Sequence, residues 1–305
     1  MQPNRLAERA RCLADLRTFM AARGVMSVDV PVLGAATVTD PFIDSLKLVG
    51  EPARYLQTSP EYYLKRLLAA GSGDVYYLGP AFRHDEASRL HRPEFTLLEW
   101  YRTGWDDRRL ADELLTLLAS LKSSVPTRTV TYHEVFTQAL GVCPHTTKTA
   151  ELRKLAKERT HAKFDSPLKS LWLDLLFSHC VQPQLGDGIT IVLDYPACMS
   201  ALAKLTTNLQ GETIARRFEC FWDGIELANG YWELTDAEEQ RQRFEADRVR
   251  RKTLERDDIK PDERFLAALE EGLPECAGVA LGVDRLLMAL TGAKDIAEVR
   301  PFADG

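Results

Sequence analysis

One stretch of this chain, residues 82–102, limits the folds open to it more than any other. It reads FRHDEASRLHRPEFTLLEWYR, and a short apolar run typical of a buried strand leads into it. A charged loop is followed by a second apolar segment, residues 94–101, which we also expect to be a strand. Because side chains alternate between the two faces of a strand, Phe95, Glu99 and Tyr101 should share one face. The stretch therefore predicts two strands joined by a charged loop.

The loop between these strands carries Arg83, Arg89 and His91 close to that face. A ring, a carboxylate and a phenol beside such a loop suit a small cationic ligand that meets a polyphosphate. A solvated hairpin with a basic loop is the alternative that composition alone favours.

Residues 58–61, Thr-Ser-Pro-Glu, predict the beginning of a helix. Ser59 suits the N-cap position, and the following proline suits the first helical position. Glu61 is then an acid in the first turn, which the helix dipole favours whatever its function.

The dipeptide Asp223-Gly224, between two apolar runs, predicts a two-residue hairpin loop. With that loop, Glu219 pairs with Ala228, and Glu219 and Glu226 lie diagonally on one face, about 7–8 Å apart. Two carboxylates in this arrangement suit Mg²⁺, which prefers oxygen ligands and also bridges phosphates. Two acids on a solvated hairpin face are the alternative.

A run of small residues at positions 278–282, Gly-Val-Ala-Leu-Gly, leads into an apolar helix pattern. We expect a buried strand followed by a helix, with Arg285 in the first turn. A glycine-rich turn of this kind is common by itself, but the Asp-Arg ending after the earlier segments makes it specific.

These segments resemble, in the same order, the motifs of the class II aminoacyl-tRNA synthetases, above all the lysyl-tRNA synthetase branch. Residues 82–102 match motif 2, residues 217–233 match the metal-binding strands, and residues 278–285 match motif 3. The first helix and a Pro-containing strand at residues 25–33 resemble motif 1, which forms the homodimer interface in that family. The resemblance covers almost the whole chain.

The resemblance implies an α+β fold, a class II synthetase catalytic core with an antiparallel β-sheet flanked by helices. It implies one catalytic domain over residues 1–305, with a helical insertion at about 125–188 between motifs 2 and 3. The chain begins directly with the helix before motif 1, so we expect no anticodon-binding domain. This arrangement, with the segments GIELANG and AGVALGVDR, is similar to the elongation factor P–lysine ligases, which are truncated paralogues of lysyl-tRNA synthetase.

Similarity to those paralogues implies ATP-dependent activation of (R)-β-lysine, or lysine, as an aminoacyl-adenylate, and transfer to a lysine of elongation factor P. It implies ATP and Mg²⁺ as cofactors and a homodimer through motif 1, and neither tRNA nor a membrane as a partner. A stand-alone amino-acid ligase, such as an asparagine synthetase of this fold, remains an alternative. A lysyl-tRNA synthetase-like enzyme acting on tRNA and an inactive regulatory paralogue are the others. The choice between α- and β-lysine stays open.

The resemblance also implies roles for individual residues. The residues expected to act in catalysis are Arg83 and Arg285. Those expected to bind ATP are Arg83, Asp85, Arg89, His91, Phe95, Glu219 and Arg285. Those expected to bind the amino-acid substrate are Ser59, Glu61, Glu99, Tyr101, Asn229, Glu233 and Ala280. The expected metal ligands are Glu219 and Glu226. Three positions depart from the usual pattern: Asp85 replaces glutamate, Arg92 replaces asparagine, and Ala280 replaces the glycine of lysyl-tRNA synthetases.

Charge and cysteine content complete these expectations. The net charge is -6, whereas proteins that grip RNA usually show a basic face. The six cysteines form no CxxC pair, and the N-terminus lacks the apolar core of a signal peptide, so we expect a cytoplasmic protein. His133, His145, His161 and His179 lack the sequence spacing of metal ligands, which favours surface or capping roles.

Overall fold

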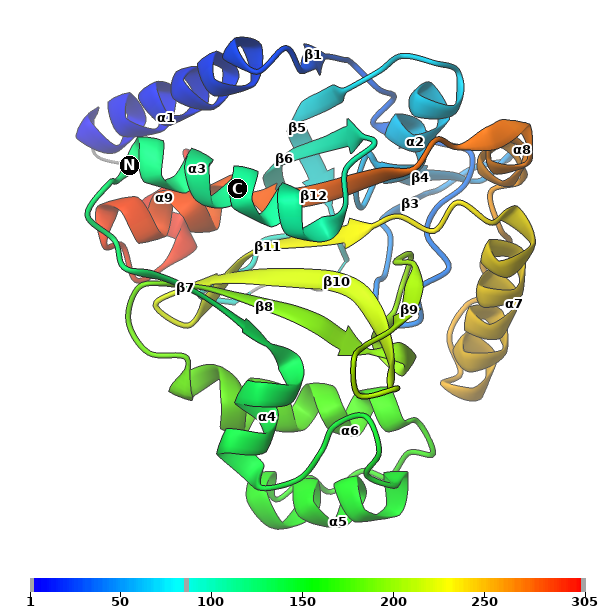
Figure 1. The fold of residues 1–305 in the computed structure, drawn as a ribbon. Helices are drawn as coiled ribbons and strands as arrows, with labels where there is room; N and C mark the ends of the chain where they lie inside the picture. The colour runs from blue at the N-terminus through cyan, green and yellow to red at the C-terminus, as the bar shows by residue number, and fades with distance from the viewer. Residues whose placement is uncertain (1–2, 85–87, 303–305) are drawn as a thin grey trace.

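The computed structural model describes residues 3–84 and 88–302, and its framework is one large mixed sheet (Figure 1). Within the described residues the strand order is β1-β5-β6-β12-β11-β10-β8-β7, and β9 pairs with the beginning of β10. Only the β1–β5 and β7–β8 pairs are parallel. The strands are β1 (Met26–Ser27), β5 (Val75–Phe82), β6 (Glu94–Thr103), β7 (Thr127–Thr131), β8 (Ile189–Pro196), β9 (Leu205–Thr207), β10 (Thr213–Trp222), β11 (Ile225–Trp232) and β12 (Cys276–Gly282). The expected α+β fold with a mainly antiparallel sheet is confirmed.

The first sixty residues contribute less strand than their alternating apolar pattern predicts. The expected strand at residues 25–33 is regular only at Met26–Ser27 (β1) and at Leu33, the first residue of β2, and Pro31 lies in the irregular stretch between them. The chain then joins a separate antiparallel sheet with the order β2-β4-β3. Its strands are β2 (Leu33–Gly34), β3 (Lys47–Leu48) and β4 (Arg54–Leu56).

Three helices cover one face of the large sheet (Figure 1). They are α1 (Pro3–Ala22), α3 (Asp107–Leu121) and α9 (Val283–Thr291). Leu16 of α1, Leu114 of α3 and Leu286 of α9 join Trp100 of β6 in one buried apolar cluster. This core supports one face of the sheet, and α9 begins at Val283, directly after β12 ends at Gly282.

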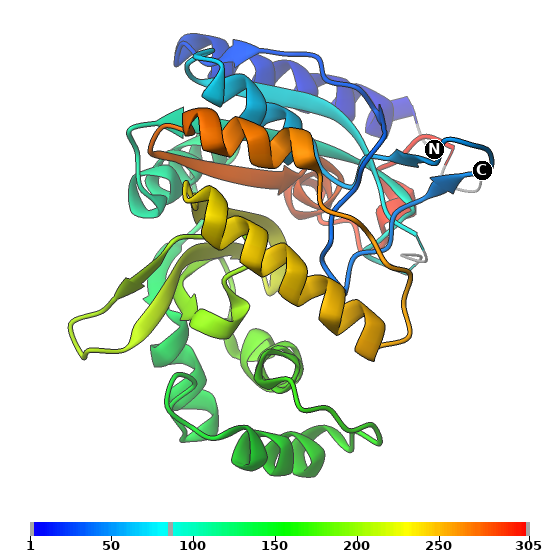
Figure 2. The same cartoon turned by 90° about the vertical axis from the view of Figure 1, so that its right-hand side faces the viewer.

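The opposite face is covered towards its two sides by two separate helix groups (Figure 2). The first group packs beside β5 and β6 around the stacked rings of Tyr62 and Phe265. The second packs on β8 and β10 around Trp172 and Tyr195. The first consists of α2 (Glu61–Ala69), α7 (Ala237–Thr253) and α8 (Glu263–Gly272), and the second of α4 (Tyr132–Leu140), α5 (Thr149–Thr160) and α6 (Lys169–Leu176). Between the two groups, the middle strands face a cavity.

The region at 125–188 is helical only after its first residues. It opens with β7, which pairs in parallel with β8 and so belongs to the large sheet. A capping box of Thr131 and Glu134 begins α4, with both reciprocal hydrogen bonds present. That the region is an insertion relative to its family stays a prediction.

Short helical turns join some of these elements, at Phe177–Val181, Gln182–Gln184, Ala197–Met199 and Ile296–Glu298. None of the helices in the described ranges has the length and apolar content that crossing a membrane requires.

A buried ion-pair network fixes the far end of β6. Arg102 pairs with Glu113 of α3, and its NH1 also donates to Asp74 at 2.9 Å. Trp100 Nε1 donates to the same Glu113 at 3.0 Å. Removing one partner of such a buried pair leaves an unmatched charge and costs about 3–5 kcal/mol. The network therefore holds in place the strand that carries much of the cavity floor.

Candidate active site

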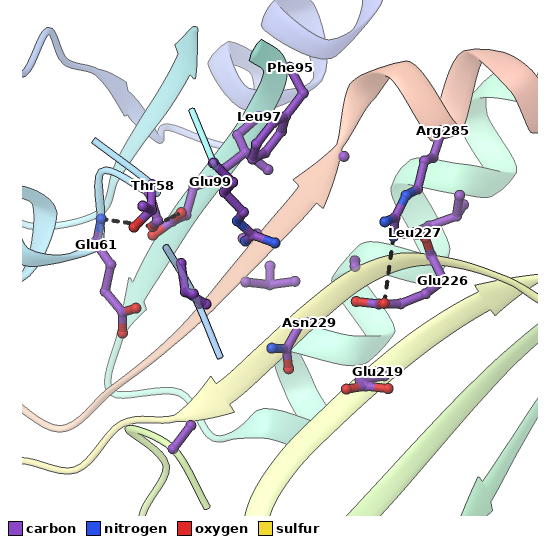
Figure 3. A pocket seen from close by; sticks show the side chains of 18 of the residues that line it. Thr58, Glu61, Phe95, Leu97, Glu99, Glu219, Glu226, Leu227, Asn229 and Arg285 are labelled. Carbon is purple, nitrogen blue, oxygen red and sulfur yellow. Dashed lines mark hydrogen bonds and ion pairs between the residues drawn. The ribbon is translucent and has the colours of Figure 1, made fainter. Parts of the chain in front are cut away.

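A cavity of about 470 Å³ lies over the middle of the sheet, between the two helix groups. Its floor comes from β6, β12, β11 and β10. Figure 3 shows Glu61 and Glu99 towards one end and Glu226 and Arg285 towards the other. Most of the residues expected to bind substrate, nucleotide or metal line this one cavity: Ser59, Glu61, Arg83, His91, Phe95, Glu99, Tyr101, Glu219, Glu226, Asn229, Glu233, Ala280 and Arg285.

Of the expected residues that the structure describes, Arg89 is not among those that line it. Arg89 is exposed, and its backbone carbonyl accepts a hydrogen bond from Ile296 N at 2.9 Å. Asp85 lies outside the described residues. Arg92 does line the cavity, but its NH2 lies 3.4 Å from Asp295 Oδ1, and its NH1 donates to loop carbonyls. The charge of Arg92 is therefore already partly matched beside the loop.

The middle of the cavity floor consists of small residues of β12. Ala280 lies between Gly278 and Gly282 on the cavity face, and it pairs with Glu99 of β6 and Asn229 of β11. With little side-chain volume on β12, groups from its two neighbouring strands approach each other across it.

Gly278 shows how tight this approach is. A Cβ atom added there would lie 2.2 Å from the Tyr101 ring and 2.6 Å from Glu233 Oε1. Real Cβ atoms do not come so close to other atoms, so the position requires glycine.

Three carboxylates, two of them buried and that of Glu61 partly buried, meet at the α2 end of the cavity. Glu61 begins α2, Glu99 lies on β6, and Glu233 directly follows β11. Lys65, one helical turn after Glu61, places Nζ 2.6 Å from Glu61 Oε1 and 2.6 Å from Glu233 Oε2. Among the described residues Lys65 is the one cation within ion-pair distance of these carboxylates. One ammonium group therefore faces three carboxylates.

Hydrogen bonds orient this carboxylate cluster. Ser59 Oγ donates to Glu99 Oε2 at 2.7 Å and accepts from Glu61 N at 3.1 Å. Tyr101 OH donates to Glu99 Oε1 at 3.0 Å. The helix begins at Glu61, one residue later than predicted, yet Ser59 still serves its first turn. Glu233 Oε1, although buried, has no hydrogen-bond partner in the described part of the chain.

The pKa values of the cluster reflect its shortage of positive charge. Burial, reinforced by the charge of Glu61, raises the pKa of Glu99 to about 7. Burial also raises the pKa of Glu233 to about 8, against the opposing effect of Lys65. Burial alone would lower the pKa of Lys65, but the charges of Glu233 and Glu61 raise it. A second cation in the cavity would stabilise the ionised carboxylates.

The β10–β11 hairpin has a register that the sequence analysis did not foresee. The predicted loop at Asp223-Gly224 is present, and next to it Phe221 pairs with Glu226. Glu219 pairs with Asn229, however, and not with Ala228, because a bulge at Leu227 inserts one extra residue into β11. The predicted Glu219–Ala228 pair is therefore wrong. Glu219 and Glu226 still line the same cavity.

Glu219 is held in a charged setting of its own. Arg217 NH2 lies 2.5 Å from Glu219 Oε1, and Tyr195 OH donates to Oε2 at 2.7 Å. Burial raises the pKa of Glu219 to about 7, although Arg217 opposes this and the nearby Glu226 adds to it. Asp174 of α6 lines the same part of the cavity, and burial raises its pKa as well.

The acids in this part of the cavity fit a magnesium ion. Their oxygens are the donors that Mg²⁺ prefers, and protein sites commonly supply one or two carboxylates while phosphates supply further ligands. The raised pKa of Glu219 also marks a place where added positive charge would be stabilising. Glu219 and Glu226 are thus the residues that would hold such an ion.

At the other end of the cavity, nitrogen atoms of Arg285 and His91 lie close together. Arg285 NH2 lies 2.6 Å from His91 Nε2, and its NH1 donates to the Glu226 carbonyl at 2.8 Å. Glu226 Oε2 lies 3.5 Å from the same NH1. Because arginine always donates, His91 Nε2 accepts in this contact, and Nδ1 can then donate to Ser88 Oγ at 2.8 Å.

Arg285 is positioned by its neighbour in sequence. The buried Asp284 accepts from Thr96 N at 2.9 Å and pairs with Arg9 of α1 at 2.6 Å. These contacts tie the first turn of α9 to β6. Directly after β5, the Arg83 guanidinium lies 5.2 Å from the centre of the Phe95 ring on β6.

Sequence reasoning missed three charged residues that shape this cavity. Lys65 follows Glu61 by four residues, a spacing that places both on one side of a helix, so the pair was detectable. Arg217 and Glu219 are two apart on one strand and share a face for the same kind of reason. Asp174 arrives from the separate helix group and left no signal in the sequence.

Comparison with known proteins agrees with this geometry. The sequence profile of the family described as tRNA synthetases class II (D, K and N) matches residues 2–304. Among curated relatives, the chain is 43% identical to the elongation factor P–(R)-β-lysine ligase of Vibrio cholerae, over 98% of this chain and 95% of the relative. It is 41% identical to the ligase of the same name from Hamiltonella defensa, over 97% and 94%. It is 40% identical to the one from Haemophilus influenzae, over 98% and 94%. The resemblance inferred from the motifs is confirmed.

The raised carboxyl pKa values predict that the ligand-free protein loses stability as the pH rises. Glu99 and Glu233 titrate near pH 7 and 8 in the folded protein, whereas glutamates of an unfolded chain titrate near their ordinary value of about 4.3. Between about pH 5 and about pH 8 the folded state therefore binds more protons. The free energy of unfolding should fall with rising pH, by up to about 1.4 kcal/mol per pH unit for each group.

Urea unfolding from about pH 5.5 to about pH 7.5 measures this slope. Glu99→Gln removes one of the titrating groups and should make the slope shallower than in the wild type. Glu151→Gln, at an exposed position of α5, is the control and should keep the wild-type slope. Equal slopes for Glu99→Gln and the wild type would show that Glu99 does not take up a proton on folding.

Proposed function

The chain belongs to the class II tRNA synthetase family, and from this premise we propose that it is an ATP-dependent elongation factor P–(R)-β-lysine ligase. The enzyme would activate (R)-β-lysine as an aminoacyl-adenylate and then transfer it to a lysine side chain of elongation factor P. The names of the relatives, together with their coverage of almost the whole chain, support this proposal.

The carboxylate cluster around Lys65 is the observation that carries the substrate assignment. Three carboxylates against one ammonium group leave two negative charges unmatched. A lysine-type substrate brings two ammonium groups, one on its backbone and one at the end of its side chain. Glu233 Oε1, which lacks a hydrogen-bond partner among the described residues, suits the terminal ammonium. Aspartate would bring a further negative charge and is disfavoured.

The first step joins the substrate carboxylate to ATP. A carboxylate oxygen attacks the α-phosphorus, the bond between the α- and β-phosphates breaks, and pyrophosphate leaves with the electron pair. The carboxylate is already ionised, so this step requires no general base. Catalysis is then a matter of positioning and of stabilising developing negative charge, for which Arg83 and Arg285 flank the cavity.

The remaining nucleotide contacts follow from the same cavity. Phe95 offers a ring face for the adenine, and His91 lies beside Arg285 where the outer phosphates would arrive. When bound, Mg²⁺ would neutralise phosphate charge, and Glu219 and Glu226 are the residues placed to hold it. Because Asp85 lies outside the described residues, its contact with adenine stays a prediction.

The second step transfers the acyl group. The neutral amine of the acceptor lysine attacks the carbonyl carbon of the adenylate, the carbon–oxygen bond to AMP breaks, and the amine nitrogen loses a proton. AMP leaves, and an amide links the substrate to the acceptor protein.

The decisive experiment separates activation from the choice of acceptor. Pyrophosphate exchange with a panel of amino acids should be strongest for (R)-β-lysine and should stop when EDTA removes Mg²⁺. Labelled substrate, ATP and enzyme should then be incubated with elongation factor P and bulk tRNA together. We expect the label on the protein and none on the RNA.

Each half of this experiment can contradict a different part of the proposal. Exchange with aspartate and not with lysine compounds would remove the substrate assignment. Label on tRNA alone would establish a synthetase-like activity in place of the protein ligase. Absence of exchange with every amino acid, in a folded enzyme that binds ATP, would support an inactive regulatory paralogue.

Ala280 is expected to influence which lysine isomer is used. Its methyl group lies on the cavity floor between Glu99 and Asn229, where the substrate backbone would approach. Ala280→Gly should raise the ratio of kcat/KM for α-lysine to that for (R)-β-lysine by about tenfold, since one methyl group in a pocket changes discrimination by about 1–3 kcal/mol. Kinetics on both isomers measure this ratio.

Ala277→Gly is the matched control for this substitution. Ala277 lies on the same strand but packs in the buried core on the other face of the sheet. Its replacement should lower stability and leave the isomer ratio unchanged. An unchanged ratio in Ala280→Gly would show that this methyl group does not discriminate between the isomers.

The proposal includes a homodimer formed through α1 and the segment that follows it. β1 lies at the edge of the large sheet, and Met26, Val32 and Leu33 are exposed apolar residues near it. A second copy covering them would remove this apolar surface from water. Sedimentation equilibrium should give about twice the chain mass of 34.3 kDa, and a monomer at micromolar concentration would contradict the proposal.

A cytoplasmic location is also part of the proposal. All six cysteines are free thiols in the structure, which fits a reducing compartment. Recovery of the native protein in a membrane or extracytoplasmic fraction would contradict it.

A further inference from the structure

A second group of ligand-type side chains lies away from the proposed active site. His133 of α4, His145 of the loop that follows and Glu212 before β10 place one ligand atom each within 4.8 Å of one another. Their spacing in sequence gave no hint of this, and the expectation that His133 and His145 have only surface or capping roles did not anticipate the cluster. His133, His145 and Glu212 line one cavity together with residues of the β9–β10 turn.

A fourth donor lies beside these three. Cys143 Sγ is 3.3 Å from Glu212 Oε1 and 3.7 Å from His133 Nδ1. Two imidazoles, a carboxylate and a thiol are the ligand types of tetrahedral zinc sites. Hard ions such as Mg²⁺ and Ca²⁺ prefer oxygen ligands throughout, so this mixed set selects against them.

The ligands are held by contacts behind them, as in built metal sites. Asn208 Nδ2 donates to Glu212 Oε2 at 2.9 Å, and Asn208 Oδ1 accepts from Glu212 N at 2.9 Å. Lys169 Nζ donates to the His145 carbonyl at 2.7 Å. The His133 and His145 rings stack with centres 5.8 Å apart. Second contacts of this kind orient ligands before an ion arrives.

One nitrogen atom of the His145 ring has surroundings that ordinary packing does not explain. His145 Nδ1 is buried and has no hydrogen-bond partner within the described ranges. A buried nitrogen without a partner costs stability unless something satisfies it, and a bound ion would do so.

The cluster opens into a cavity of about 410 Å³, which gives an ion a route of entry. Arg108, Asp194 and Arg216 form other parts of its wall. Among the described residues, this cavity shares no lining residue with the active-site cavity. The cluster is thus separate from the acids expected to hold Mg²⁺.

We propose that His133, His145 and Glu212, with Cys143 as the fourth ligand, form a binding site for a zinc-type divalent transition metal ion. Tetrahedral ligands at about 2.0–2.3 Å from one ion lie about 3.3–3.8 Å apart, so the group closes by only a small movement. The ion links the loop after α4 to the β9–β10 turn, which are far apart in sequence. The site is structural in position, since it lies outside the cavity where the reaction is proposed.

Metal binding by the untagged full-length protein tests this site directly. The protein is stripped with a chelator, the chelator is removed, and Zn²⁺ alone is added in competition with a chromophoric zinc indicator. We expect one tightly bound equivalent and a higher Tm with zinc present. Loss of an outer partner of a metal ligand typically weakens binding about 10–100-fold, so Asn208→Ala should fall in that range. Glu212→Gln and His145→Asn should each lose about a hundredfold or more.

Control variants separate this site from adventitious binding. His161→Asn keeps a residue that tolerates the positive φ of this helix end and should bind zinc like the wild type. With Co²⁺ in place of zinc, a sulfur-to-cobalt charge-transfer band should appear, disappear in Cys143→Ser and persist in Cys180→Ser. Absence of that band in the wild type would overturn the assignment of Cys143.

Equal zinc affinity in the wild type and a Glu212→Gln, His145→Asn double variant would overturn the whole site. Urea unfolding of the metal-free variants shows whether they are folded, and Glu212→Gln retains an oxygen that can accept from Asn208. Zinc binding is measured without substrate or ATP, so failure of this proposal is distinguishable from failure of the proposed enzymatic activity.

Discussion

The excess of buried negative charge around Lys65 is the constraint on which the active-site end of this structure depends. Burying carboxylates is costly unless cations accompany them. Here one internal ammonium group serves Glu61 and Glu233, while Glu99 is held by hydroxyl groups from Ser59 and Tyr101. These contacts hold the cluster in place, although its three carboxylates outnumber the one ammonium group beside them. Under the proposed function, this shortage of positive charge would favour a doubly positive amino acid.

The surrounding sheet brings this cluster together and holds it in place. β12 supplies almost no side-chain volume on the cavity face, and Gly278 could not be any other residue. The buried Asp284 ties α9 to β6, so the arginine next to it is aimed by the same contacts that close the core. The contacts that aim Arg285 and those that pack the core therefore depend on one another.

The parts of this site that could be predicted from sequence were those that local periodicity encodes. Alternation on β6 places Phe95, Glu99 and Tyr101 on one face, and the resemblance to known motifs supplied their roles. Charge partners one helical turn apart, such as Glu61 and Lys65, were encoded but overlooked. Asp174 and the His133–His145–Glu212 cluster depend on how separate helices dock, and no spacing in the sequence expresses that.

The bulge at Leu227 also restricts which changes of sequence the site can tolerate. A strand repeats every two residues, so a regular β11 could present Glu226 to the cavity, or Asn229 and Glu233, but not all of them. Because of the extra residue, even-numbered positions face the cavity before Leu227 and odd-numbered positions face it afterwards, so one segment contributes Glu226 as well as Asn229 to the cavity. Deletion of Leu227 would restore plain alternation and turn either Glu226 or the pair of Asn229 and Glu233 away from the cavity. The site therefore constrains the length of this strand as well as its side chains.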